Sequence, residues 1–186
     1  MVDKRCSVAQ YLEVVSGTAR DYEQLGRFHY RGGLSGPCAG IYALKEFHPV
    51  RRRFGDCVGV IVYTMGAPAL ELRNAATGGR FSGFGDRRLG LEMVNKHIRC
   101  ISRVIIEPRY RGLGLASRLV RETMPKMNVG IVEAMAVMGG VNPFFEKAGM
   151  RRYEGGQPLR CVKMAEAFGM VRMVVLSRRM KINERS

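Results

Sequence analysis

The sequence predicts one α/β domain, in which a mixed central sheet carries helices on both faces. Segments of strand and helix type alternate along the chain, with one long insert near the middle. The 186 residues fit a single domain spanning 1–186, and a hydrophobic content of 46% is enough for one packed core. The most informative stretch is 101–127, where an apolar strand, a glycine-bearing loop and an amphipathic helix follow one another.

The first third of the chain contains strand and helix signals in the order strand, helix, strand, strand. Thr18, with Asp21 three residues later, resembles a capping box that opens a helix. The last of these strands is almost entirely apolar, which predicts burial on both faces of the sheet. We expect strands over 5–15, 38–47 and 56–65, and a helix over 19–28.

Residues 66–97 form a basic insert without clear periodicity. A connection of this length is unusual in a compact domain and is often functional. Its arginines (Arg73, Arg80, Arg87 and Arg88) are interleaved with Phe81 and Phe84. We interpret it as part of an acceptor-binding surface; the alternative is an ordinary surface loop.

The stretch 101–127 predicts an anion site between a strand and a helix. Ile101–Ile106 reads as a buried strand, and Pro108 ends it because proline cannot donate to a ladder. Gly112 and Gly114 let the backbone approach a ligand, and N–H groups at a helix start point at negative charge. The helix that follows has one apolar face, made of Leu115, Leu119, Val120 and Met124.

Pyrophosphate suits this loop, because Arg111 adds a guanidinium that grips phosphate oxygens. The loop lacks the Gly-Lys-Ser/Thr ending of a P-loop. It also lacks the third glycine of a dinucleotide fingerprint, where Ser117 stands. A tight strand-to-helix turn without a ligand is the alternative.

Two motifs resemble those of the GNAT acetyltransferase superfamily. Arg-x-x-Gly-x-Ala at Arg111–Ala116 is similar to its acyl-CoA pyrophosphate loop, and Asn142–Met150 is similar to its Asn…Tyr-Glu-Lys-x-Gly-Phe segment. The resemblance implies the GNAT fold, with a splayed gap between the fourth and fifth strands where the thioester of acetyl-CoA enters. Phe145 stands where the family often has a proton-donating tyrosine, which leaves the general acid open.

The remaining elements fit this architecture. Asn142 is expected to be the N-cap of a short helix with Pro143 at its first position, and Gly149 ends that helix. A fifth strand is expected at 131–137, where Glu133 is a base or, in preference, a structural ion partner. A helix at 159–168, a strand at 170–176 and a frayed charged tail at 178–186 complete the expected order.

The resemblance assigns coenzyme-binding roles to the fourth strand, the loop and the short helix. Main-chain groups of the strand would pair with pantetheine amides. The loop would hold the pyrophosphate. The assigned residues are Val104, Ile105, Ile106, Arg111, Gly112, Leu113, Gly114, Leu115, Ala116, Asn142 and Phe145.

Proton transfer is predicted for His29 and Tyr30, with Ser102 as a weaker candidate. A helix-ending histidine beside a packing tyrosine is the alternative. Three stretches, Phe28–Gly33, Ile101–Val104 and Val141–Met150, resemble GNAT-type domains associated with ABC-class ATPases. The His-Tyr pair also resembles phage Mom-type enzymes, which modify adenine in DNA, so a metal ion at His29 stays open.

Charge and cysteine content bear on partners and location. The formal net charge is +15, and counting gives 24 Arg and 7 Lys among the 31 basic residues. This excess predicts contact with nucleic acid, DNA or tRNA; arginine richness from genome composition is the alternative. Five scattered cysteines indicate reduced thiols in a cytoplasmic protein. No membrane span or signal peptide is expected, and a homodimer stays open.

Three functions follow as hypotheses. The leading one is a coenzyme-dependent enzyme that modifies an amine on nucleic acid, such as a DNA base. The second is ordinary N-acetyl transfer to aminoacyl-tRNA, protein or a small-molecule amine. The third is a binding module that keeps the GNAT fold without catalysis.

Overall fold

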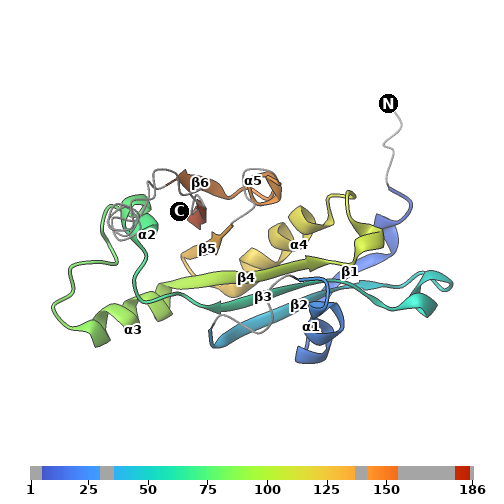
Figure 1. Ribbon diagram of the computed structural model, residues 1–186, viewed down its shortest axis with the longest axis horizontal. Coiled ribbons are helices and arrows are strands. Elements are labelled where there is room, and N and C mark those ends of the chain that lie inside the picture. Colours follow the sequence, from blue (N-terminus) through green and yellow to red (C-terminus); the bar gives the residue numbers. More distant parts are fainter. Residues whose placement is uncertain (1–5, 30–35, 137–141, 155–178, 185–186) are drawn as a thin grey trace, which may run out of the picture.

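The computed structural model describes residues 6–29, 36–136, 142–154 and 179–184. Seven strands form one mixed sheet in the order β1-β2-β3-β4-β5-β7-β6, in which only β4 and β5 are parallel neighbours. Helix α1 lies on one face of this sheet and α4 on the other, while α2 and α3 lie toward one end (Figure 1). The predicted α/β class and its two-sided covering are therefore confirmed.

The first four strands form an antiparallel meander through the middle of the domain. Strand β3 is buried on both faces, as its apolar sequence predicts. The predicted capping box opens α1, because Thr18 Oγ1 accepts from the Asp21 N–H. Their bounds are β1 Leu12–Ser16, α1 Ala19–Gly26, β2 Cys38–Glu46, β3 Cys57–Met65 and β4 Ile98–Ile106.

Two apolar clusters pack on opposite faces of this meander. Leu44 and Ile61 lie on the α4 side, with Leu119 of the helix. Ala43 and Val62 lie on the α1 side, with Leu25 of the helix. The alternation of faces along β2 and β3 is the period-two pattern of a strand, and it fixes the register of the sheet.

The insert at 66–97 contains two helices, α2 at Glu71–Ala76 and α3 at Arg87–His97. The expectation of a long irregular connection, drawn from the lack of periodicity, was therefore wrong. Helix α2 is only six residues long and α3 has a weakly apolar composition, so neither repeats a clear helical pattern. Contact with the sheet, through Val94 for example, stabilises them.

The second half of the chain returns to the sheet through α4. Helix α4 spans Leu115–Thr123, β5 Ile131–Met135, α5 Phe144–Lys147, β6 Arg151–Glu154 and β7 Arg179–Glu184. In the part of the chain that the structure describes, single-turn 3₁₀ helices lie at Ala9–Tyr11 (η1), Arg51–Phe54 (η2), Pro108–Tyr110 (η3) and Met124–Met127 (η4).

The prediction of a frayed C-terminal tail was wrong for residues 179–184, which form a strand. The tail expected to fray contains β7, which pairs with both β5 and β6. Met180 and Ile182 alternate with polar residues, a strand signal that the charge of the tail concealed. The helix expected at 159–168 and the strand at 170–176 lie outside the described residues. No helix in the described part of the chain is long and apolar enough to cross a bilayer.

Candidate active site

A splayed gap opens between β4 and β5. The two strands pair from Ile98↔Ile131 to Ile101↔Ala134, and among the described residues β4 has no partner on that edge beyond Ile101. The rest of β4, Ser102–Ile106, therefore presents an unpaired edge of main-chain groups toward the gap. This confirms the gap that the sequence resemblance implied.

A bulge in β4 lies where the strands part. Tyr63 of β3 pairs with Ile101 and Val62 pairs with Arg103, so Ser102 is an extra residue in the ladder. A bulge bends its strand and increases the local twist, which turns the end of β4 away from β5. The Ser102 hydroxyl donates to the Val62 carbonyl at 3.1 Å and so replaces a missing ladder contact.

The loop after β4 has the backbone conformation of an anion site. Gly112 and Gly114 have φ values of 82° and 73°, in the left-handed region that favours glycine. Gly114 is the N-cap of α4 and offers no side chain to cap it. Across the described residues, none of the main-chain N–H groups of Gly112–Ser117 has a hydrogen-bond acceptor. Six donors near the helix start suit a multiply charged oxyanion.

Helix α4 holds this loop rigidly against the sheet. Leu115, Leu119 and Val120 are buried, as the predicted apolar face requires. At its last turn, the hydroxyls of Thr123 and Tyr63 are hydrogen-bonded at 2.7 Å in the core. Burial raises the pKa of Tyr63, so this phenol stays protonated and structural.

Arg111 ties the loop to the end of the strand. Its Nε donates to the Ile106 carbonyl at 3.0 Å, while the residue remains exposed. This contact uses Nε alone and places the guanidinium between the β4 edge and the loop. The contact brings Arg111 of the loop next to Ile106 at the end of β4, and the coenzyme-binding role of both residues stays a prediction.

Helix α5 docks beside the loop. Ser117 Oγ donates to the Phe144 carbonyl at 2.9 Å, and Arg121 donates to the Lys147 carbonyl at 3.1 Å. Phe145 is buried against Phe144, with ring centroids 4.2 Å apart, and Asn142 is exposed. The N-cap is Pro143 rather than the predicted Asn142, because the helix begins one residue later at Phe144.

The buried carboxylate of Glu46 positions the segment that leads into the loop. It accepts from Arg51 Nε at 2.7 Å, from the His48 N–H at 2.9 Å and from the Tyr110 hydroxyl at 3.2 Å. Burial would raise the pKa of Glu46, but these hydrogen bonds and the Arg51 charge outweigh it and hold the pKa below its ordinary value. Sequence reasoning missed this residue, because its burial and its contact with Tyr110, 64 positions away, depend on the fold.

We expect Glu46→Gln to change the pH dependence of stability. The Glu46 pKa is lower in the folded protein than in the unfolded chain, where it is near 4.5. The ionised carboxylate therefore stabilises the fold at pH values above 4.5, and this stabilisation is lost as the pH falls through the folded-state pKa. Denaturant unfolding between pH 7 and pH 3 should therefore show a weaker acid dependence for the variant than for the wild type. Glu92→Gln, at an exposed surface pair, is the control. Parallel pH profiles for wild type and Glu46→Gln would contradict this role.

The predicted proton-transfer residues are only partly described. His29 follows α1, and its N–H donates to the Gly26 carbonyl at 3.0 Å. Helix α1 covers the opposite face of the sheet from α4 (Figure 1). Tyr30 lies outside the described residues, so the role of the pair stays a prediction. No group of three metal-binding side chains occurs among the described residues, and a metal at His29 stays a prediction too.

Glu133 and Arg73 form a buried ion pair. The sequence analysis expected an ion pair for Glu133 but did not identify Arg73 as its partner. Both side chains are fully buried, and their atoms meet at 2.6 Å and 2.8 Å. The preferred interpretation of Glu133, a structural ion partner, agrees with this geometry. Arg73 is not part of an acceptor surface, because it is committed to Glu133 and to the Ala67 carbonyl.

Two thiols on β3 and β4 are poor nucleophiles. Burial raises the pKa of Cys57 to about 11 and that of Cys100 to about 12. Both are thiols at neutral pH, and the thiolate is the reactive form. Neither cysteine is therefore suited to form a covalent acyl intermediate.

Solved structures share this fold at low sequence identity. NAA60 of Arabidopsis thaliana in complex with acetyl-CoA superposes with a TM-score of 0.56, at 11% identity over 94% of this chain and 99% of that chain. A GNAT family N-acetyltransferase (YhbS) from Escherichia coli in complex with CoA gives 0.49, at 11% identity over 94% and 81%.

The N-acetylglutamate synthase of Neisseria gonorrhoeae, complexed with coenzyme A and N-acetyl-glutamate, gives a TM-score of 0.47 at 11% identity. The alignment covers 94% of this chain and 35% of that one, so this chain spans about a third of it. No protein-family model and no curated protein matches the sequence. The superposition on NAA60, the splayed β4–β5 pair and the loop before α4 together show that the chain has the fold of the GNAT N-acetyltransferases.

Proposed function

We propose that the protein is an acyl-CoA-dependent N-acyltransferase. The observation that carries the proposal is the row of main-chain N–H groups from Gly112 to Ser117, which lack acceptors beside the unpaired edge of β4. A pyrophosphate supplies the charge that these donors require, and the gap supplies a place for an extended arm. NAA60, the structural neighbour with the same fold, is complexed with acetyl-CoA.

In this proposal the coenzyme lies across the gap from the loop to the bulge. Arg111 and the loop amides hold the pyrophosphate, and main-chain groups of Val104–Ile106 pair with the pantetheine amides. The acceptor amine attacks the thioester carbonyl, a C–N bond forms, the C–S bond breaks and the coenzyme leaves as a thiolate. The amine proton passes to a base, for which His29 and Tyr30 are the proposed residues. Phe145 has no proton to give, so the thiolate takes its proton from solvent or another group.

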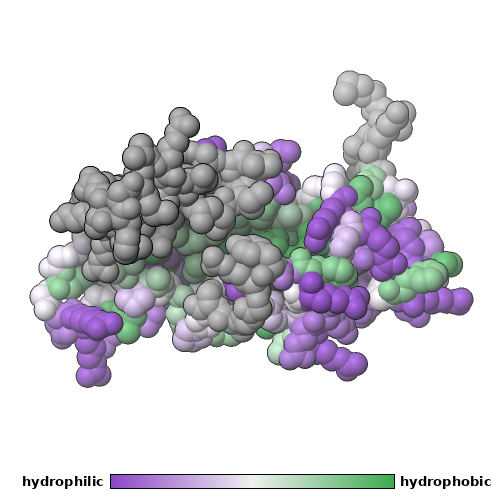
Figure 2. All heavy atoms as spheres, viewed as in Figure 1, coloured by the Kyte–Doolittle hydropathy of each residue, from purple (hydrophilic) through white to green (hydrophobic). Residues whose placement is uncertain are grey.

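For the acceptor, we propose an amine on nucleic acid. The net charge of +15 and the exposed cations of the β2–β3 connection support this choice. Among the described residues Arg52 and Arg53 have no carboxylate partner, and Phe54 beside them is 70% exposed. Hydrophilic side chains gather over this end of the molecule (Figure 2). The narrower likenesses to Mom-type enzymes and to ABC-ATPase-associated domains rest on the sequence motifs alone.

The test combines purified protein, acetyl-CoA carrying a labelled acetyl group, and separate acceptors: duplex DNA, aminoacyl-tRNA, a protein mixture and small amines. We expect label in nucleic acid, with a matching mass increase of one nucleoside after digestion. Label only in aminoacyl-tRNA, protein or small amines would favour ordinary N-acetyl transfer. Coenzyme binding without transfer to any acceptor would favour a non-catalytic module, which Phe145 in place of a tyrosine supports.

The basic connection offers a further check on the acceptor. Arg52→Ala/Arg53→Ala should weaken DNA binding and reduce its salt dependence, because two phosphate contacts are lost. Arg87→Ala/Arg88→Ala removes the same charge from α3 and is the matched control. Equal losses in both double variants would mean that net charge alone governs binding, and would contradict a role for the β2–β3 connection.

A further inference from the structure

A pocket lies at the opposite end of the parallel strands from the anion loop. It has a volume of about 400 Å³ and is bounded by the turn after α2, the end of α3 and the start of β5. His97 immediately precedes β4, and the anion loop follows the other end of that strand. Nine strand residues separate the two places by roughly 30 Å. The pocket is therefore not part of the proposed acyl-transfer site.

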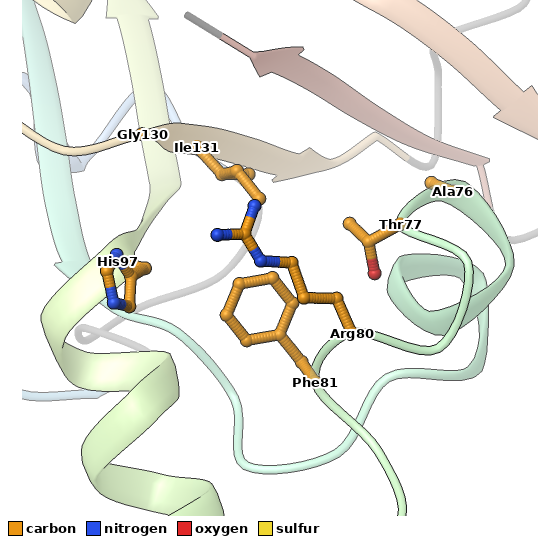
Figure 3. A pocket seen from close by; sticks show the side chains of 7 residues that line it. All are labelled: Ala76, Thr77, Arg80, Phe81, His97, Gly130 and Ile131. Carbon is orange, nitrogen blue, oxygen red and sulfur yellow. The ribbon is translucent and has the colours of Figure 1, made fainter.

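The wall of this pocket combines a guanidinium with aromatic rings. The guanidinium of Arg80 extends across the pocket beside the Phe81 ring toward Ile131, with His97 on the far side of that ring (Figure 3). Arg80 Cζ lies 5.9 Å from the Phe81 centroid, and the Phe81 and His97 rings lie 6.5 Å apart. Among the described residues, no acidic side chain lines the pocket and none forms an ion pair with Arg80.

The frame around the pocket is rigid, so the arrangement is preformed. Phe81 is 5% exposed and packs in a core cluster with Val94, Ile98 and Ile131. The buried Arg73–Glu133 pair fixes α2 to β5. Gly78 and Gly79, with φ values of 59° and 79°, form the turn that carries Arg80 to the pocket. The turn is closed by the Gly79 N–H, which donates to the Asn74 carbonyl at 2.7 Å.

We propose that this pocket binds a small ligand that joins a flat aromatic body to an anionic group, a carboxylate or a phosphate monoester. The volume is within the range of small-molecule sites. A planar body would lie against Phe81 and His97, while the anion would meet the Arg80 guanidinium, which has no carboxylate partner among the described residues, in a forked contact. Ligand binding here would join the insert to the start of β5 without touching the anion loop.

The test uses phenyl phosphate as the probe, with coenzyme A present so that the anion loop is occupied. The chain has three histidines, so their imidazole C–H resonances are resolvable by proton NMR, and His97→Gln assigns the relevant one. We expect saturable movement of the His97 resonance and none of His29 or His48. Inorganic phosphate, which lacks the ring, and benzyl alcohol, which lacks the charge, should bind much more weakly.

Arg80→Ala should weaken phenyl phosphate binding at least about tenfold, the loss expected for one charge-assisted hydrogen bond. Arg88→Ala removes the same charge from the same insert at an 86% exposed side chain and should leave the affinity unchanged. Equal weakening by both variants, equal binding of inorganic phosphate, or an unmoved His97 resonance would each overturn the proposal. Coenzyme A affinity, measured in parallel, reports separately on the proposed acyl-transfer site.

Discussion

Replacing Gly114 by valine is expected to weaken coenzyme A binding by on the order of 10- to 100-fold. Gly114 has φ +73° at the N-cap of α4, a conformation that a β-branched residue adopts only with strain. The loop would rearrange to relieve that strain, and the N–H groups of Gly112–Ser117 would no longer converge on the pyrophosphate. Isothermal titration with coenzyme A measures the effect.

Gly85→Val is the matched control for this change. Gly85 lies in the insert without a positive φ, and a Cβ added there meets nothing within 4 Å. It should leave coenzyme A affinity at the wild-type value. If Gly114→Val remained folded and bound coenzyme A as tightly as the wild type, the loop amides would not be the pyrophosphate site.

Replacing Arg73 by methionine is expected to lower the free energy of unfolding by about 3–5 kcal/mol, because it leaves the Glu133 carboxylate buried without a partner. A loss of that size is a large part of the ~5–15 kcal/mol that stabilises a typical domain. Denaturant unfolding at neutral pH measures it.

The double variant Arg73→Met/Glu133→Leu tests the cause of this loss. It buries no lone charge, so it should recover much of the stability that the single change removes. Arg88→Ala, which breaks an exposed i,i+4 pair with Glu92, should have a far smaller effect. A double variant as unstable as the sum of its single changes would contradict the ion-pair explanation.

The coenzyme half of the candidate site could be predicted from the sequence because its signals are local. Pro108, Gly112, Gly114 and the apolar face of α4 lie within 17 consecutive positions, 108–124, and each has a direct conformational consequence. The conformation of the loop is therefore determined by residues close together in the sequence. The structure has the loop between a strand and a helix, with Gly112 and Gly114 at positive φ, as expected.

Contacts between distant residues could not be predicted in this way. Arg73 reads as one more arginine of a basic insert, and only the fold brings it to Glu133, 60 positions away. Glu46 similarly depends on Tyr110, 64 positions away. Strand β7 was missed because its charged residues suggested a solvent-exposed tail. Its pairing with β5 and β6 depends on where the fold places those strands. The burial of a side chain and the pairing of a strand depend on the whole fold, so they cannot be inferred from composition.

The most direct measurement is a crystal structure of the protein with coenzyme A. We predict that pyrophosphate oxygens will lie within hydrogen-bonding distance of the loop amides after Arg111. We also predict that the pantetheine arm will lie along Val104–Ile106 in the gap between β4 and β5. Coenzyme bound elsewhere, or a loop that closes on its own side chains while the gap stays empty, would contradict it.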